Sequence, residues 1–247
     1  MVHYMKSKPW KKFAVVGCSH GHHIDPIARQ SVLDFKKSYE PDLFIHAGDF
    51  IDMEAFMGGG SGEGDPVAPD FQAGIDFLMD GMFDVVLCGN HEDRLWRLEH
   101  SSNEVVAECA RMLKDKIVKT CDIIDAELIP YTGVFQKYRF SNALVTHGTI
   151  YNENASRDMA EMYNEANVII YAHTHKVGFA KGRRSDCPSA YCVGTLTQRG
   201  AMAYAKNRRA TMAWSQGIVY GEYNDEICLP QIYEHPQALQ GKPWKIR

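Results

Sequence analysis

Five short apolar runs, each followed at once by a cluster of polar residues, constrain the fold of this chain more than any other feature. The runs are 13–16, 43–47, 85–88, 143–145 and 168–171. Continuous apolar runs of this length are typical of buried strands in an α/β sheet. Because the carboxyl ends of neighbouring strands in an open α/β sheet border one crevice, we expect the five clusters to lie together.

The clusters supply side chains of the kinds that bind transition metals. Their candidate residues are Cys18 and His20 in Gly-Cys-Ser-His-Gly, Asp49 and Asp52 in Gly-Asp-Phe-Ile-Asp, Asn90 and His91 in Gly-Asn-His-Glu, His147 in Thr-His-Gly, and His173 and His175 in Ala-His-Thr-His. Such a mixture of nitrogen and oxygen donors suits divalent transition metals. The number of donors favours two ions in one site.

In this order, the clusters resemble the motifs of the calcineurin-like metallophosphoesterases: Gly-Asp-x-His-Gly, Gly-Asp-x-x-Asp, Gly-Asn-His-Glu, a later strand-end His, and Gly-His-x-His. The resemblance covers roughly residues 13–200, with Cys18 in place of an Asp and Ala172 in place of a Gly. It implies an α/β fold, a two-sheet αββα sandwich. The length of 247 residues suits one large α/β domain, so we expect 1–247 to be a single domain in which 201–247 adds strands to the part that carries the motifs.

The same resemblance implies a role for each candidate. Asp49 would bridge two divalent or trivalent ions of manganese, zinc, iron or nickel. One ion would be held by Cys18, His20, Asp49 and His175, and the other by Asp49, Asn90, His147 and His173. The His-Thr-His alternation fits this division if the segment is extended. His91, which is no ligand, would stabilise the transition state or protonate the leaving oxygen, and Asp52 would orient a ligand or the neighbouring backbone.

Arg94 extends the third cluster to Gly-Asn-His-Glu-x-Arg, a form found in the protein Ser/Thr phosphatase branch, where the Arg binds substrate phosphate. That branch also has Arg-Gly after Gly-Asp-x-x-Asp, whereas Met53 and Glu54 stand here. We therefore do not assign protein dephosphorylation.

The activity that the resemblance implies is hydrolysis of a phosphomonoester or phosphodiester by direct attack of metal-bound water or hydroxide. No covalent enzyme intermediate is expected. One alternative is a nuclease or nucleic-acid end-processing phosphodiesterase. Another is a metal-binding scaffold with little or no turnover, prompted by Cys18, although the presence of His91 favours catalysis.

Several candidates have a second interpretation. Cys18 could ligate as a thiolate, which favours zinc or iron over manganese, or remain a buried thiol that leaves one ion weakly held. Asn90 could cap the helix that follows it, with or without ligating a metal. Arg94 could be a solvated helix residue or an ion-pair partner. His22 and His23 are expected at the surface, near the start of a helix.

Composition bounds the partners and the location. A formal net charge of −4 over 247 residues gives no overall signature of nucleic-acid binding. No run approaches the ~18 apolar residues of a membrane span, and the polar start is unlike a secretory signal. The seven cysteines lack CxxC spacing and indicate neither a disulfide framework nor a zinc ribbon. We expect a cytoplasmic protein that acts on a phosphoester and has no membrane partner.

Two further segments have open interpretations. Basic residues gather after the last cluster, and they would form either a patch that guides a phosphate or nucleic acid, or a solvated face of a sheet. They are Lys181, Arg183, Arg184, Arg199, Lys206, Arg208 and Arg209. The glycine-dense segment 57–66 is expected to be a loop beside the crevice, either a lid or a surface excursion.

Periodicity predicts the remaining elements. Helices are expected over 25–39, over 92–116 with a break near 101–103, and over 155–166. The second of these regions would turn toward the core Leu95, Leu98, Val105, Val106, Cys109, Met112 and Leu113. Residues 138–145 are expected to form paired strands. The strands expected at 177–180, 190–196, 217–223 and 227–233 would make up the second sheet.

Overall fold

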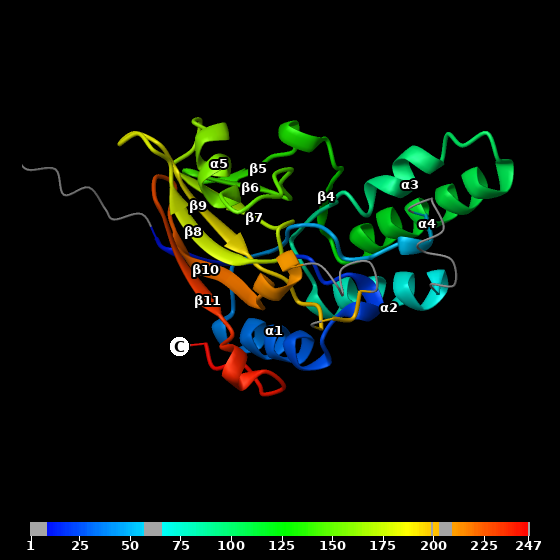
Figure 1. Cartoon of the computed structure of the whole chain (residues 1–247), viewed down its shortest axis with the longest axis horizontal. Coiled ribbons are helices and arrows are strands. Elements are labelled where there is room, and N and C mark those ends of the chain that lie inside the picture. The colour runs from blue at the N-terminus through cyan, green and yellow to red at the C-terminus, as the bar shows by residue number, and fades with distance from the viewer. Residues whose placement is uncertain (1–8, 57–65, 199, 203–208, 247) are drawn as a thin grey trace, which may run out of the picture.

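The computed structural model describes residues 9–56, 66–198, 200–202 and 209–246, and its strands form two sheets (Figure 1). The larger sheet has six strands in the order β11-β10-β1-β2-β3-β4. Its strands are β1 (Lys11–Val16), β2 (Leu43–His46), β3 (Val85–Leu87), β4 (Glu127–Ile129), β10 (Gly217–Tyr223) and β11 (Cys228–Glu234). Strands β1 to β4 are parallel, whereas β10 is antiparallel to both β1 and β11.

The smaller sheet has five strands in the order β5-β6-β7-β9-β8. They are β5 (Tyr138–Phe140), β6 (Ala143–Thr146), β7 (Val168–Tyr171), β8 (Val177–Lys181) and β9 (Ser189–Val193). Strands β6, β7 and β9 are parallel, and the two edge strands are antiparallel to their neighbours. Phe13 and Val15 of β1 pack with Val145 and Ile170 of this sheet, so the two sheets share one apolar layer.

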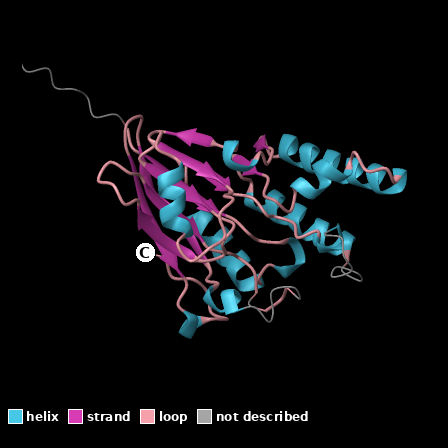
Figure 2. Cartoon of the chain, turned by 45° about the horizontal axis from the view of Figure 1, so that its top comes forward, coloured by secondary structure: helices cyan, strands magenta, loops and turns pink. Residues whose placement is uncertain are grey.

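Helices cover the outer faces of both sheets, as Figure 2 shows. The larger sheet packs against α1 (Pro26–Tyr39), α2 (Val67–Gly81) and α4 (Glu104–Ile123). The smaller sheet packs against α5 (Ala155–Met162). Successive residues of β1 point to opposite faces, so Ala14 and Val16 contact the helices while Phe13 and Val15 contact the other sheet. The predicted αββα sandwich is confirmed.

Local capping explains where the helices begin. The Asp25 carboxylate accepts hydrogen bonds from the N–H groups of Ile27 and Ala28 and starts α1 at Pro26. The Asn103 side chain likewise accepts from Val105 and Val106, so the predicted break near 101–103 separates α3 (Asp93–Leu98) from α4.

The predicted core face of α4 is wrong at two positions. Val105 and Met112 are 79% and 65% exposed. The packed face of α4 passes instead through Ala110, Ile117 and Cys121, which recur at helical spacing. Leu95 of α3 is buried as expected.

The predicted second sheet is also wrong in its membership. Only β8 and β9 of the four late strands belong to the smaller sheet, which already contains β5 to β7. Strands β10 and β11 return to the larger sheet, where β10 lies beside β1. The apolar run of β10 pairs with β1 along five residues, so its long-range partner and not its place in the sequence decides its sheet.

The expected glycine-dense loop, 57–66, lies outside the described residues apart from Pro66. Within the described part of the chain, no helix combines the length and the apolar character that a membrane span requires.

Candidate metal centre

The polar clusters meet where strand ends of both sheets come together. Cys18 follows β1 and Asp49 follows β2 in the larger sheet, while His147 follows β6 and His173 follows β7 in the smaller one. The site thus lies between two sheets. The strand-end pattern had predicted a site at the edge of one sheet. The loops that follow β1 and β7 lie close together here. A Cβ added to Gly17 would lie only 3.0 Å from the Cβ of Ala172.

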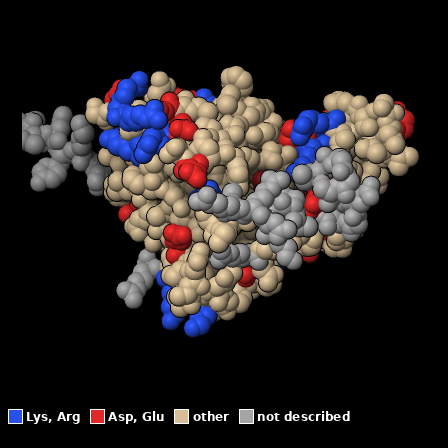
Figure 3. All heavy atoms as spheres, in the orientation of Figure 1, with Lys and Arg blue, Asp and Glu red and all other residues tan. Residues whose placement is uncertain are grey.

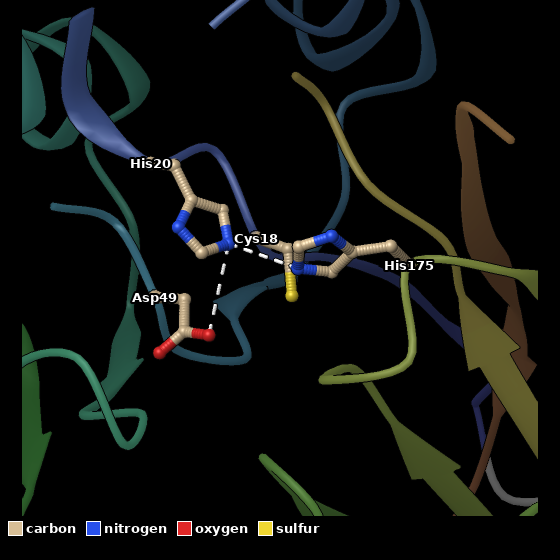
Figure 4. Close-up of side chains that lie close together, drawn as sticks. All are labelled: Cys18, His20, Asp49 and His175. Carbon is tan, nitrogen blue, oxygen red and sulfur yellow. Dashed lines mark hydrogen bonds and ion pairs between the residues drawn. The ribbon is translucent and has the colours of Figure 1, made fainter. Parts of the chain in front are cut away.

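One group of donors consists of Cys18, His20, Asp49 and His175, all buried (Figure 4). A ligand atom from each lies within 4.8 Å of the others. The Nε2 atom of His20 is 2.9 Å from Nε2 of His175 and 3.7 Å from Oδ2 of Asp49. The structure therefore gathers residues from three separate clusters around a space between four donor atoms.

A second group shares Asp49 with the first. Asp49, His147 and His173 have ligand atoms within 4.8 Å of one another. Nε2 of His147 lies 3.1 Å from Oδ2 of Asp49 and 3.1 Å from Oδ1 of Asn90. Asn90 follows β3, and it does not cap α3, because that helix begins at Asp93 with Glu92 at its N-cap.

Contacts on the far side of two imidazole rings fix which nitrogen is free. Nδ1 of His147 donates to the Ala47 carbonyl at 2.8 Å, and Nδ1 of His20 donates to Oδ1 of Asp52 at 2.8 Å. With Nδ1 as the donor, Nε2 is the atom of each ring that can bind a cation at the Asp49 carboxylate. Although burial lowers the pKa of His147, Asp49 raises it, so in metal-free protein a proton lies between this ring and the carboxylate. A metal ion would take the place of that proton, and outer contacts of this kind orient metal-binding His.

Charge states agree with metal binding. Burial lowers the pKa values of His20, His173 and His175, that of His173 to about 4, so these rings are neutral. Burial raises the pKa of Asp49, but His147 and His91 outweigh it and hold that pKa well below its usual range. Neutral imidazoles and an ionised carboxylate are the forms that ligate metals.

Cys18 differs from the other donors. Burial, and then the Asp49 charge, raise the pKa of its thiol well above the usual value. The Sγ atom accepts a hydrogen bond from the N–H of His173 at 3.3 Å. In metal-free protein Cys18 is therefore a buried neutral thiol. It would become a thiolate ligand if a cation bound beside its Sγ atom.

His91 and Arg94 lie next to the two groups of donors. Nδ1 of His91 donates to the Asp52 carbonyl at 2.6 Å, and its Nε2 lies 3.9 Å from Oδ2 of Asp49. Although burial lowers the pKa of His91, Asp49 and Asp52 together raise it to about 9. Arg94 donates from Nη1 to the carbonyls of Asp52 and Met53, at 2.7 and 3.0 Å. It is therefore not fully solvated, and it forms no ion pair with any of the residues that the structure describes.

Five donor residues have a left-handed backbone. The φ angles are 53° at Cys18, 50° at His20, 56° at Asp49, 67° at His173 and 58° at His175. Each such residue costs roughly 1–2 kcal/mol, and clusters of them are typical of functional sites. The expected extended His-Thr-His segment is wrong for the same reason, since the chain turns tightly there. Its two rings still join different donor groups.

Two buried residues that support the site were missed in the sequence. The Glu92 carboxylate accepts hydrogen bonds from the N–H groups of Asp49, Ile51 and Gly89, so it joins the loops after β2 and β3. Its place in Gly-Asn-His-Glu was a signal that could have found it. Gln136 accepts from the N–H of His147 at 2.9 Å and donates to the Cys88 carbonyl, and no local pattern marks it.

The remaining histidines and basic residues fall in different places. His23 is buried, contrary to expectation, whereas His22 is partly exposed. Lys181, Arg183 and Arg184 gather over the β8–β9 turn (Figure 3), at the amino end of β9 and away from the metal centre. Among the other basic residues, Arg199, Lys206 and Arg208 lie outside the described residues, as does the side chain of Arg209.

Comparisons with known proteins agree with this geometry. A family model described as calcineurin-like phosphoesterase matches residues 11–177. A solved structure of a hypothetical protein from Pyrococcus horikoshii OT3 is similar with a TM-score of 0.50 at 10% identity, over 90% of this chain and 87% of that chain. At this identity the likeness concerns the fold alone.

Two other solved structures are similar at lower TM-scores. A novel phosphatase from Mycoplasma pneumoniae gives 0.48 at 11% identity, over 92% of this chain and 94% of that chain. YfcE, a phosphoesterase from E. coli, gives a TM-score of 0.41 at 14% identity, over 85% of this chain and 91% of that chain. No curated protein sequence is a significant match to the chain.

Proposed function

Since the chain belongs to the calcineurin-like phosphoesterase family, we propose that it hydrolyses a phosphomonoester or phosphodiester with two metal ions held around Asp49. One observation carries the proposal. Oδ2 of Asp49 lies 3.7 Å from Nε2 of His20 and 3.1 Å from Nε2 of His147, and the far side of each ring is bound to an acceptor. Two Nε2 atoms therefore converge on one buried carboxylate with their rings already oriented, which is the arrangement that holds metal ions at a shared Asp.

Each ion takes donors from both sheets. The proposed ligands are Cys18, His20, Asp49 and His175 for one ion, and Asp49, Asn90, His147 and His173 for the other. Manganese, zinc, iron and nickel all suit such donors, and a Cys18 thiolate favours zinc or iron. When bound, the ions neutralise charge on the phosphate oxygens and lower the pKa of water to near neutrality.

His91 is the proposed proton donor to the leaving oxygen. The Asp52 carbonyl accepts the Nδ1 proton of His91 at 2.6 Å, and Nε2 of the same ring lies on the side of Asp49, where a leaving oxygen can take a proton from it. Nη2 of Arg94 is 3.4 Å from that Nε2. Arg94 and Asn90 line one hollow at the surface, where the guanidinium can bind a substrate phosphate.

We extend the proposal to the rest of the chain. Residues 1–247 form one domain, which the pairing of the late strand β10 with the first strand β1 supports. The protein works in the reducing cytoplasm, which its seven free cysteines support.

Turnover of two chromogenic substrates tests the proposed activity. Metal-stripped protein is refilled in turn with manganese, zinc, iron or nickel and given 4-nitrophenyl phosphate or bis(4-nitrophenyl) phosphate. We expect turnover with at least one metal, and the better substrate then separates a monoesterase from a diesterase. His91→Ala should lower kcat by about 10²–10⁴-fold with unchanged metal content, since it removes a proton donor and no ligand.

The matched control is His100→Ala, at a histidine whose side chain is 79% exposed beyond the end of α3. It should change neither kcat nor metal content. Full turnover in His91→Ala would contradict the assigned role. Metal binding without turnover of either substrate would favour the scaffold, and salt-sensitive retention on a DNA column would favour the nuclease.

A further inference from the structure

A further group of metal-binding side chains lies beside the two groups around Asp49. It consists of His23 from the 3-10 turn Gly21–His23, Asp52 from the loop after β2, and Glu54 from the 3-10 turn Glu54–Phe56. One ligand atom from each residue lies within 4.8 Å of the others, and all three residues are buried. We propose that His23, Asp52 and Glu54 bind a third divalent cation.

Two of the three side chains present polar atoms that lack a hydrogen bond. The His23 and Asp52 side chains are 9% and 1% exposed, and among the described residues nothing hydrogen-bonds Nε2 of His23 or Oδ2 of Asp52. These two atoms lie 3.8 Å apart, which is too long for a hydrogen bond. The gap is shorter than twice a metal–ligand distance of ~2.1 Å, so one ion can contact both atoms.

The charges of this region also favour a bound cation. The carboxylates of Asp52 and Glu54 are buried within one group. The guanidinium of Arg94 is close by, but its Nη1 donates to backbone carbonyls of this loop and to neither carboxylate. A buried carboxylate oxygen without a hydrogen bond is costly, and Oδ2 of Asp52 is such an atom among the described residues. A divalent ion bound there would satisfy it.

Asp70 holds the neighbouring loop in place. Its carboxylate accepts hydrogen bonds from the N–H groups of Asp52 and Met53, so it fixes the loop without using the side-chain oxygens of Asp52. A hollow lined by Asp52, Glu54, Pro66 and Asp70 reaches the group and gives an ion access. One imidazole nitrogen and two carboxylates suit manganese or zinc.

The third ion would act on the reaction through Asp52. Oδ1 of Asp52 accepts from Nδ1 of His20 at 2.8 Å and lies 3.1 Å from Nδ1 of His91. An ion on Oδ2 would therefore hold the carboxylate that orients both rings. His23 and Glu54 are positioning residues in this scheme, because they touch neither the substrate nor the two ions around Asp49.

Anomalous diffraction from crystals of the full chain grown with manganese tests the proposal directly. We expect a peak within about 2.4 Å of one donor atom each of His23, Asp52 and Glu54. A water molecule there, or no anomalous peak while the groups around Asp49 are filled, would overturn the proposal. A peak at the third site with empty groups around Asp49 would instead refute the proposed function and leave this inference standing.

Metal content and kinetics of variants give a second readout. After dialysis against manganese, Glu54→Gln and His23→Gln should each bind one ion fewer per chain than wild type. The control His100→Gln changes a ring that is 79% exposed beyond the end of α3, and it should bind as many ions as wild type. Loss of the third ion should lower kcat by about tenfold and leave KM unchanged. Wild-type metal content in both Glu54→Gln and His23→Gln would contradict the proposal.

Discussion

The substitution Gln136→Glu tests whether one buried amide fixes the loop of His147. Gln136 is 1% exposed. Its Nε2 donates to the Cys88 carbonyl at 2.6 Å and to the Pro130 carbonyl at 3.2 Å, while its Oε1 accepts from the N–H of His147 at 2.9 Å. Glutamate has the same shape, but it replaces the donor with an oxygen, so two carbonyls would face an acceptor.

The size of the effect depends on pH. Only the protonated form of the introduced carboxyl can donate to the Cys88 carbonyl, and burial raises a carboxyl pKa by ~3–5 units, each worth about 1.4 kcal/mol. Its folded-state pKa would lie above the unfolded value of ~4.3, so the variant loses stability as pH rises toward the folded-state pKa. With one lost hydrogen bond of about 1 kcal/mol, the free energy of unfolding should fall by about 2 kcal/mol at pH 5 and about 5 kcal/mol at pH 8.

Urea unfolding of the metal-stripped proteins at both pH values measures this difference. The control is Gln231→Glu, at an exposed position of β11, where the change should stay within about 0.5 kcal/mol. An equal loss at pH 5 and pH 8, or a loss below about 1 kcal/mol at pH 8, would refute the assignment of Gln136 as the donor to these carbonyls.

Two further predictions concern the metal centre. Cys18→Asp replaces a soft donor with a hard one, so competition between manganese and zinc, followed by elemental analysis, should show a shift toward manganese; an unchanged ratio would mean that Cys18 touches no ion. In metal-free protein the pKa of His91 is about 9, above its unfolded value of ~6.5. His91 should therefore stabilise the fold by roughly 3 kcal/mol at pH 6.5, and this stabilisation should be lost as pH rises through 9. Urea unfolding of wild type and His91→Gln at pH 6.5 and 9.5 checks this, and a constant difference between them would contradict it.

The sequence predicts the strand ends of this site well and its long-range arrangement poorly. Apolar runs before Asp49, His147 and His173 are local signals, and each run is a strand in the structure. The sheet that β10 joins depends on its pairing with β1, about 200 residues away in sequence, and no local pattern encodes that choice.

The finer geometry of the site has the same limitation. The left-handed backbone at His173 and His175 is rare for residues other than Gly, so the pattern favoured an extended segment instead. Gln136 lies in a loop without a motif around it, and its importance arises from distant backbone groups such as the Cys88 carbonyl and the N–H of His147. Short edge strands such as β4 bury little surface and leave a weak signal.

The position of the metal centre across two sheets bears on how the protein resists unfolding. Asp49 follows a strand of the larger sheet, and His147, His173 and His175 follow strands of the smaller one. When the free metal concentration is a hundred times Kd, an ion bound between them would add about 2.7 kcal/mol to the free energy of unfolding. This contribution is similar to that of a disulfide. The ions would then serve as a reversible cross-link, and scarcity of metal in the cell would weaken the attachment of one sheet to the other as well as the chemistry.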